Sequence, residues 1–195
     1  MTLPLNPPPA PHPPAVFSPD RRHRYRLSRG PWNDTLPTLG VVGHNPSTAD
    51  EDHDDNTVIR LKDFAQLFGF GGFNLYNLSA GRATNPKHLR TMADPIGPEN
   101  DSYLHELGHT HDVILLAWGT NADPQRARTV TTGLWRALRQ RGGTLATLGW
   151  TAHRQPPHPL RLPRTTALVS LSVTAGQHPS QIDPRWRHLI ADDTQ

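Results

Sequence analysis

The sequence of 195 residues contains no cysteine. Disulfide bonds, cysteine nucleophiles and zinc–thiolate centres are therefore excluded. Long apolar runs are missing as well, since none approaches the roughly 20 residues that span a bilayer. From these absences we expect a soluble, cytoplasmic protein without a membrane partner.

Lysine is scarce, and acids are missing from one long segment. Lys62 and Lys87 are the only lysines. Between Pro124 and Ile182 there is no aspartate or glutamate, although this segment carries eight arginines. A general use of arginine in place of lysine explains the number of arginines in this segment, but it does not explain the absence of acids. A basic segment of this kind favours contact with phosphate groups, so we expect a nucleic acid or a nucleotide as the partner.

Proline is abundant, and its distribution is uneven. Of the 21 prolines, seven lie within the first 14 residues. A segment so rich in proline forms neither a helix nor a central strand, and it buries little apolar surface. We expect a disordered proline-rich tail over residues 1–20, a single α/β domain over residues 21–175 and a C-terminal extension over residues 176–195.

Apolar strands and helical patterns alternate along the rest of the chain. Val113–Trp118 is a continuous apolar run of the kind found in buried parallel strands. This alternation predicts an α/β fold, a three-layer sandwich with a mainly parallel central sheet. The expected strands are Arg22–Leu27, Leu36–Val42, Phe73–Leu78, Val113–Trp118, Thr144–Leu148 and Ala167–Val173, and the expected helices are Thr57–Phe68, Glu99–His109 and Thr129–Arg141.

Polar loops follow four of the predicted strands. Asn45 follows the strand Leu36–Val42, and Asn77 lies at the end of the strand Phe73–Leu78. Trp118 ends the strand Val113–Trp118, and His158 lies beyond the strand Thr144–Leu148. Because the carboxyl ends of parallel strands meet at one edge of a sheet, we expect these side chains to converge on one cleft.

Asn45 is the leading chemical candidate among these loop residues. It precedes Pro46, which biases its backbone toward an extended conformation. Its amide both donates and accepts hydrogen bonds, so it can orient a water molecule or a polar atom of a substrate. Asn, Pro and Ser are also ordinary turn residues, and a purely structural role stays open.

The same loop continues into an acidic run, in which only His53 interrupts the acids between Asp50 and Asp55. Carboxylates of this kind hold hard cations such as Mg²⁺. A solvated acidic loop is the alternative, and Asp54 or Asp55 is suited to cap the following helix. We expect no cofactor, with magnesium as the alternative, and its ligands would be Asp50, Asp52, Asp54 and Asp55.

His158 lies between prolines, in the run Pro156-Pro157-His158-Pro159. Rigid neighbours fix the direction of the imidazole, which suits a group that meets a developing charge. The chain has 12 histidines, so an ordinary surface role is the alternative. Trp118 fits a core position and also a platform on which a base stacks.

An ordered set of short motifs runs from about Arg22 to Leu162, and its members are Arg24-Tyr25, Trp32, Asn45-Pro46-Ser47-Thr48-Ala49-Asp50, Asp54-Asp55-Asn56-Thr57, Arg60, Asn77-Leu78, Arg82-Ala83-Thr84-Asn85-Pro86, Asn100-Asp101, Ala117-Trp118-Gly119 and His158-Pro159-Leu160. In this order the motifs resemble the domain-of-unknown-function family 1643. Gln155 stands where the family pattern has a glycine. The family name implies no activity.

A second resemblance does imply an activity. Gly43-His44-Asn45-Pro46, Asn77, Leu116-Ala117-Trp118-Gly119 and His158-Pro159 are similar, in this order, to motifs of the uracil-DNA glycosylase superfamily. The resemblance implies that fold and a DNA-repair hydrolase that flips a nucleotide out of the duplex. In that chemistry Asn45 would position water, and His158 would donate a hydrogen bond to the departing base. Phe73 or Tyr76 would stack on the base.

Taken together, the sequence predicts a glycosylase-like enzyme that acts on a nucleobase N-glycosidic bond in a nucleic acid or a nucleotide. The alternatives are a non-catalytic binding module for these ligands and a metal-dependent phosphoesterase that uses the acidic run. The candidate catalytic residues are Asn45 and His158, the candidate substrate-binding residues are Ser47, Thr48, Phe73, Asn77, Arg82 and Trp118, and the polar residues specific to the family are Asp50, Asp54, Asp55 and Arg60.

Overall fold

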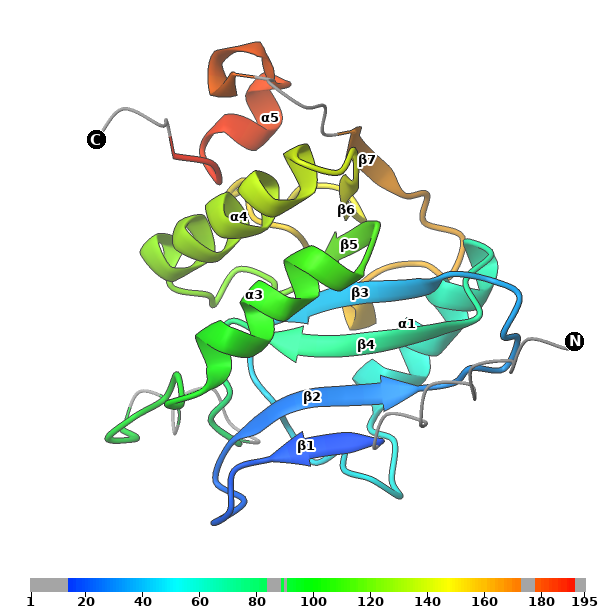
Figure 1. Cartoon of the computed structure of the whole chain (residues 1–195), viewed down its shortest axis with the longest axis vertical. Helices are drawn as coiled ribbons and strands as arrows, with labels where there is room; N and C mark the ends of the chain where they lie inside the picture. Colours follow the sequence, from blue (N-terminus) through cyan, green and yellow to red (C-terminus); the bar gives the residue numbers. More distant parts are fainter. Residues whose placement is uncertain (1–13, 84–88, 90, 173–177, 192–195) are drawn as a thin grey trace, which may run out of the picture.

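The computed structural model describes residues 14–83, 89, 91–172 and 178–191. These residues form a seven-stranded sheet in the order β1-β2-β4-β3-β5-β6-β7 (Figure 1). The strands are β1 (Ala15–Phe17), β2 (Arg24–Arg29), β3 (Thr38–Gly43), β4 (Gly72–Asn77), β5 (Val113–Leu116), β6 (Thr144–Thr147) and β7 (Val169–Ser172). The helices are α1 (Asn56–Leu67), α3 (Asn100–Thr110), α4 (Pro124–Arg139) and α5 (Pro184–Arg187), with 3₁₀ turns η1 (Pro159–Arg161) and η2 (Pro179–Gln181).

The four central strands, β4, β3, β5 and β6, run parallel to one another. Gly43 pairs with Asn77, and Val42 pairs with Leu116, so three of these strands end close together at one edge. The outer strands β1, β2 and β7 are antiparallel to their neighbours. The predicted α/β fold is confirmed, with a sheet that is parallel at its centre and mixed as a whole.

Two apolar cores flank the sheet, because successive side chains of a strand point to opposite faces. Val42 and Ile114 pack in one core with residues of α3 and α4. Val41 and Leu115 pack in the other core with residues of α1. Figure 1 shows the same arrangement, with α3 and α4 on one side of the sheet and α1 on the other.

Side-chain caps mark the starts of α1 and α4. Asp55 accepts a hydrogen bond from the backbone N–H of Val58 and so caps α1, as one of the two acids considered for this role. Asp123 caps α4, which begins at Pro124 and therefore starts earlier than predicted. An aspartate followed by proline is a typical helix start. Within the described ranges, no helix combines the length and the apolar character needed to cross a membrane.

The two ends of the chain contribute more structure than the sequence indicated. Strand β1 lies inside the segment 1–20 that was expected to be disordered, and it pairs with β2 through Ala15 and Leu27. This correction has a simple cause, since Ala15–Phe17 is an apolar stretch that directly follows the proline-rich first 14 residues. Residues 1–13, and the expected boundary between residues 175 and 176, lie outside the described residues. Trp186 of α5 is fully buried in the core beside α4.

Candidate functional site

A cavity of about 460 Å³ opens where β3, β4 and β5 end. Its volume falls within the roughly 300–1,000 Å³ that is typical of small-molecule sites. The loops after β3 and β6 and the start of α1 complete its wall. The predicted site residues that line it are Asn45, Ser47, Asp55, Asn77, Trp118 and His158.

The side-chain amide of Asn45 is held in one orientation. Its Nδ2 donates hydrogen bonds of 2.8 Å to the carbonyl oxygens of Pro46 and Ala83. Because both partners are acceptors, the amide nitrogen must face them, and Oδ1 is turned the other way. Among the described residues, none donates a hydrogen bond to this oxygen. Asn45 therefore presents a fixed acceptor at the cavity wall.

His158 complements Asn45 with a donor. Its Nδ1 accepts a hydrogen bond of 3.4 Å from the backbone N–H of Leu160, so in the neutral ring the proton lies on Nε2. Burial, followed by repulsion from Arg161, lowers the pKa of His158 below its usual value, while Asp55 opposes this shift. At neutral pH His158 is therefore uncharged and can donate through Nε2–H.

Asn77, at the end of β4, adds a second unused polar group. Its side chain is only 2% exposed, and its Nδ2 is buried without a hydrogen-bond partner among the described residues. A Cβ at Gly43 would lie 2.8 Å from Oδ1 of Asn77, so the absence of a side chain at Gly43 leaves room for the Asn77 amide. An unpaired buried donor costs about 1–3 kcal/mol, which a ligand with an acceptor would recover.

Trp118 forms part of the wall but belongs to the core. It is 2% exposed and packs among residues of α3 and α4. The core interpretation therefore fits its burial better than a role as a stacking platform.

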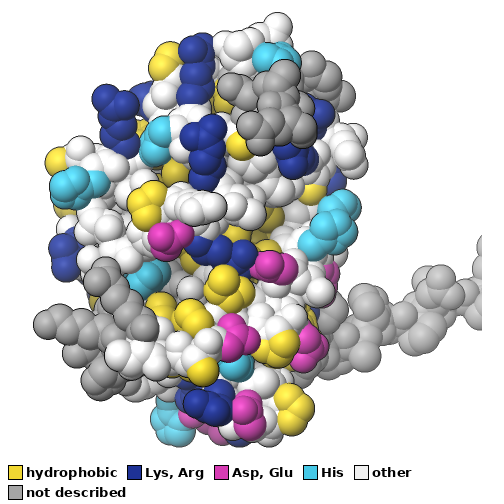
Figure 2. Space-filling view, turned by 90° about the vertical axis from the view of Figure 1, so that its left-hand side faces the viewer, with side chains coloured by type: hydrophobic (Ala, Val, Ile, Leu, Met, Phe, Trp, Pro, Cys, Tyr) yellow, Lys and Arg dark blue, Asp and Glu magenta, His cyan; other side chains and the backbone are white. Residues whose placement is uncertain are grey.

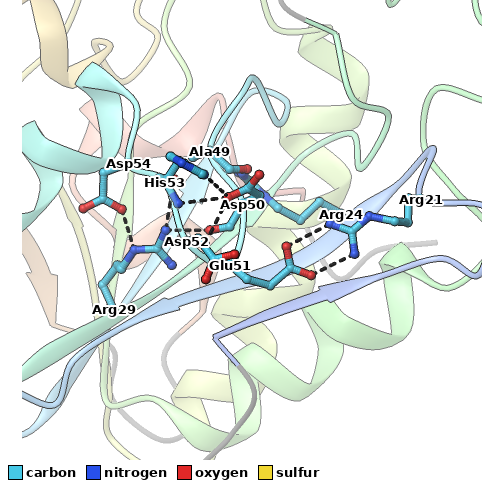
Figure 3. Close-up of polar contacts among 9 residues, drawn as sticks. All are labelled: Arg21, Arg24, Arg29, Ala49, Asp50, Glu51, Asp52, His53 and Asp54. Atoms are coloured by element: carbon cyan, nitrogen blue, oxygen red, sulfur yellow. Dashed lines mark hydrogen bonds and ion pairs between the residues drawn. The ribbon is translucent and has the colours of Figure 1, made fainter.

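The cavity also contains a buried arginine to which the sequence patterns assigned no role. Arg24, the first residue of β2, is 2% exposed and lines the cavity. Its Nη1 donates a hydrogen bond of 2.6 Å to the carbonyl oxygen of Ala49 (Figure 3). Burial lowers the pKa of Arg24 to about 10, so the side chain is still charged at neutral pH. Its place in the Arg24-Tyr25 motif was the signal that could have identified it.

Two acids of the run from Asp50 to Asp55 form ion pairs with arginines of the β1–β2 region (Figure 3). Glu51 accepts two hydrogen bonds of 2.8 Å from Arg21. Asp54 accepts one of 2.5 Å from Arg29, whose Nη2 also donates to the backbone carbonyl oxygen of Asp50. These contacts fasten the acidic loop to the antiparallel side of the sheet.

The other acids of the run are engaged locally. Oδ1 of Asp50 accepts hydrogen bonds from the backbone N–H groups of Asp52 and His53. Asp55 caps α1 and is the acid of this run that reaches the cavity wall. Across the described parts of the chain, no group of three or more His, Asp or Glu side chains is arranged to hold a metal ion. This geometry favours a structural role for the acidic run over a magnesium site.

Several predicted site residues do not line the cavity. Phe73 is fully buried near the start of β4, at the opposite end of the strand from the cavity, so it cannot stack on a base there. Tyr76, the other aromatic considered, is fully buried in the α3 and α4 core. The guanidinium of Arg82 lies 5.0 Å from the ring centre of Phe17. The predicted residues outside the cavity wall are Thr48, Asp50, Asp52, Asp54, Arg60, Phe73, Tyr76 and Arg82.

Charged side chains are unevenly distributed on the surface. Figure 2 shows the side toward which β3 and β4 point, with most Lys and Arg in the upper part and most Asp and Glu lower down. Two arginines of the segment without acids pair with acids that precede this segment in the sequence. Arg126 contacts Asp101 at 2.5 Å, and Arg164 contacts Asp63 at 3.3 Å. A nucleic-acid partner stays a prediction.

Comparison with known proteins places the chain in a family. Residues 24–160 match the family described as "Protein of unknown function (DUF1643)". Since this match covers well over half of the sequence, the chain belongs to that family. Searches of curated proteins and of solved structures found no significant match. The likeness to the uracil-DNA glycosylase superfamily therefore stays a prediction.

Proposed function

We propose that this member of the DUF1643 family hydrolyses the N-glycosidic bond between a nucleobase and its sugar, with the cavity at the strand ends as the active site. One observation carries the proposal. Asn45, whose Oδ1 is a fixed acceptor, and His158, whose Nε2–H is a neutral donor, line the same cavity. Hydrolysis of this bond needs both, one for the attacking water and one for the departing base.

The acceptor serves the water. A water molecule that donates a hydrogen bond to Oδ1 of Asn45 turns an oxygen lone pair toward the anomeric carbon. Because Nδ2 is anchored on two backbone carbonyl oxygens, this orientation requires no further ordering during the reaction. The C–O bond to water forms as the C–N bond to the base breaks.

The donor serves the base. The electron pair of the broken C–N bond moves onto the base, where negative charge develops on its oxygen. His158 donates a hydrogen bond to that oxygen. Because its ring is uncharged, it does not repel the positive charge that develops on the sugar. The proton released by the attacking water neutralises the base, so the products are a free base and a sugar hydroxyl.

Asp55 supplies a negative charge opposite to the positive charge that develops on the sugar. Its carboxylate lines the cavity, and one of its oxygens is fixed by the backbone N–H of Val58. The transition state of glycosidic cleavage has oxocarbenium character, which a nearby carboxylate stabilises. A rigid carboxylate, acceptor and donor within one cavity fit this reaction class better than phosphate-ester hydrolysis at the acidic run.

The test is release of free base, followed by chromatography. The substrates are nucleosides and nucleotides with uracil or hypoxanthine, and oligonucleotides that contain the same bases. We expect release by the wild type and a loss of about 100-fold or more for Asn45→Ala and His158→Ala. His153→Ala is the matched control, since His153 is an exposed histidine of the same loop outside the cavity wall. No release from any substrate, or equal release by all the variants, would overturn the proposal.

Binding of oligonucleotides without cleavage would instead support the non-catalytic binding module. The gathering of arginines in Figure 2 is the observation that favours this second candidate. Such binding would weaken steeply with salt, because contacts to phosphate release counterions.

A further inference from the structure

Arg24 is a buried cation that makes few hydrogen bonds with the described residues. A guanidinium has five N–H donors. The hydrogen bond of its side chain within the described structure is the one from Nη1 to Ala49, and Nε is buried without a partner. Buried arginines are ordinarily paired with an acid, because an unpaired buried charge is costly. Among the described residues, no acid forms an ion pair with Arg24.

The neighbouring acids do not fill this role. Asp55 and Asp50 attract Arg24 electrostatically, but neither lies within ion-pair distance of it in the described residues. Oδ1 of Asp55 is committed to the N-terminus of α1, and Oδ1 of Asp50 is committed to its own turn. Arg24 thus keeps its charge next to acids that are already engaged.

Arg82 adds a second cation close to Arg24. Its repulsion contributes to the lowered pKa of Arg24. The guanidinium of Arg82 donates to the backbone carbonyl oxygen of Arg21 and lies over the ring of Phe17, while its Nε is also buried without a partner. Arg24 therefore lies near a second cation as well as near Asp55 and Asp50, and a bound anion would reduce the repulsion between the two guanidinium groups.

We propose that Arg24 binds a phosphate monoester, so that the cavity takes a phosphorylated nucleotide rather than a free nucleoside. The planar fork of arginine matches the oxygens of a phosphate, and water is largely excluded at this position. The identity of the remainder of the ligand rests on the proposed function, whereas the phosphate site does not.

The test measures binding without turnover. Calorimetry with the Asn45→Ala variant, which the proposed function makes inactive, compares uridine with uridine 5′-monophosphate. Inorganic phosphate and a single-stranded oligonucleotide serve as further ligands. We expect the monophosphate to bind about tenfold or more tightly than the nucleoside, and inorganic phosphate to compete with it. A tighter complex with the oligonucleotide would assign the phosphate to a nucleic-acid backbone.

Arg26 offers a matched control on the same strand. It is also buried, but it pairs with Glu106 at 3.4 Å and does not line the cavity. Arg24→Met removes the preference for the monophosphate, whereas Arg26→Met retains it. If Arg24→Met does not fold, the Nε–Hε resonance of Arg24, assigned with Arg24→Lys, reports the site in a phosphate titration of the wild-type fold.

Each outcome decides between the two proposals. Equal affinity for nucleoside and monophosphate, no binding of either, or an unmoved Arg24 resonance overturns the phosphate site. Phosphate-dependent binding that Arg24→Met removes, without base release by the wild type, supports the phosphate site and overturns the glycosidic reaction.

Discussion

The indole Nε1 of Trp118 donates a hydrogen bond of 2.9 Å to Oε1 of Gln155, and this bond joins the end of β5 to the loop that carries His158. Both side chains are buried. The loop is fastened nearby as well, because the backbone N–H of Gly119 donates to the carbonyl oxygen of Pro156. Gln155, which departs from the glycine of the family pattern, thus helps to position His158.

We predict that Gln155→Leu destabilises the protein. The substitution keeps the volume but leaves a buried indole N–H without an acceptor, so the free energy of unfolding falls by about 1–3 kcal/mol. Urea denaturation measures this change. Gln140→Leu, at an exposed glutamine beyond α4, is the control and should change stability by less than about 0.5 kcal/mol. If both variants lost the same free energy of unfolding, the hydrogen bond between Trp118 and Gln155 would not be the cause of the loss.

Gly119→Ala should lower both stability and activity, whereas a control glycine should lower stability alone. Gly119 has φ of +79°, and a Cβ there would lie 3.2 Å from Cβ of His158. The matched control is Gly142→Ala, since Gly142 has φ of +75° with no atom within 4 Å of an added Cβ. We expect both variants to lose about 1–2 kcal/mol in thermal unfolding through backbone strain. Base release should fall about tenfold or more in Gly119→Ala alone, because only there does the new methyl group displace His158.

Asn45→Asp tests the orientation of the amide. The new carboxylate would face the carbonyl oxygens of Pro46 and Ala83 and lose both hydrogen bonds. We expect a loss of about 1–3 kcal/mol at pH 7, and a smaller loss near pH 4, where a protonated carboxyl can donate. Asn33→Asp is the control, because Oδ1 of Asn33 is an acceptor for Thr35, a role that aspartate retains. A loss independent of pH would contradict this orientation.

His111 is a buried histidine that is neutral in the folded protein. Asn74 donates to its Nε2 at 2.9 Å. The hydroxyl of Thr110 donates a hydrogen bond to the backbone carbonyl oxygen of Glu106 and therefore accepts one from Nδ1–H of His111. Burial lowers the pKa of His111 to about 4. Protonation of the ring would break the hydrogen bond from Asn74.

From this we predict a loss of stability in mild acid. The unfolded chain binds the proton near pH 6.5 and the folded protein near pH 4, so the free energy of unfolding falls as the pH drops between these values. Protonation of His111 alone lowers the free energy of unfolding by about 3 kcal/mol over this pH range. Denaturation at pH 7, 5.5 and 4.5 measures the slope, which His111→Gln should flatten. His105→Gln, at an exposed position of α3, should leave it unchanged.

The local features of the fold could be predicted from the sequence. The apolar run Val113–Trp118 becomes β5, and the polar loop around Asn45 lies at the end of β3. Periodicity and turn residues act over short distances, so they are readable in one chain. Helix α4 begins at Pro124 and so before the predicted start at Thr129, because the side chain of Asp123 caps it.

The sequence predicts less well the residues whose role depends on partners far away in the chain. Phe73 was a reasonable stacking residue by type, but the direction of β4 places it at the wrong end. In the sequence Arg24 is one of many arginines, and only its burial beside the cavity distinguishes it from the others. Burial and orientation arise from contacts between segments far apart in the sequence, so composition and spacing carry little information about them.

The sequence by itself determined the α/β architecture, the polar loops at the strand ends and the candidacy of Asn45 and His158. Only the tertiary structure decided that these two share a cavity with Arg24, and that most of the acidic run is engaged by arginines and backbone instead. The physical reason is that a carboxylate or a guanidinium has no fixed role of its own. Its role is set by the partner that folding brings within hydrogen-bond distance and by the water that folding removes.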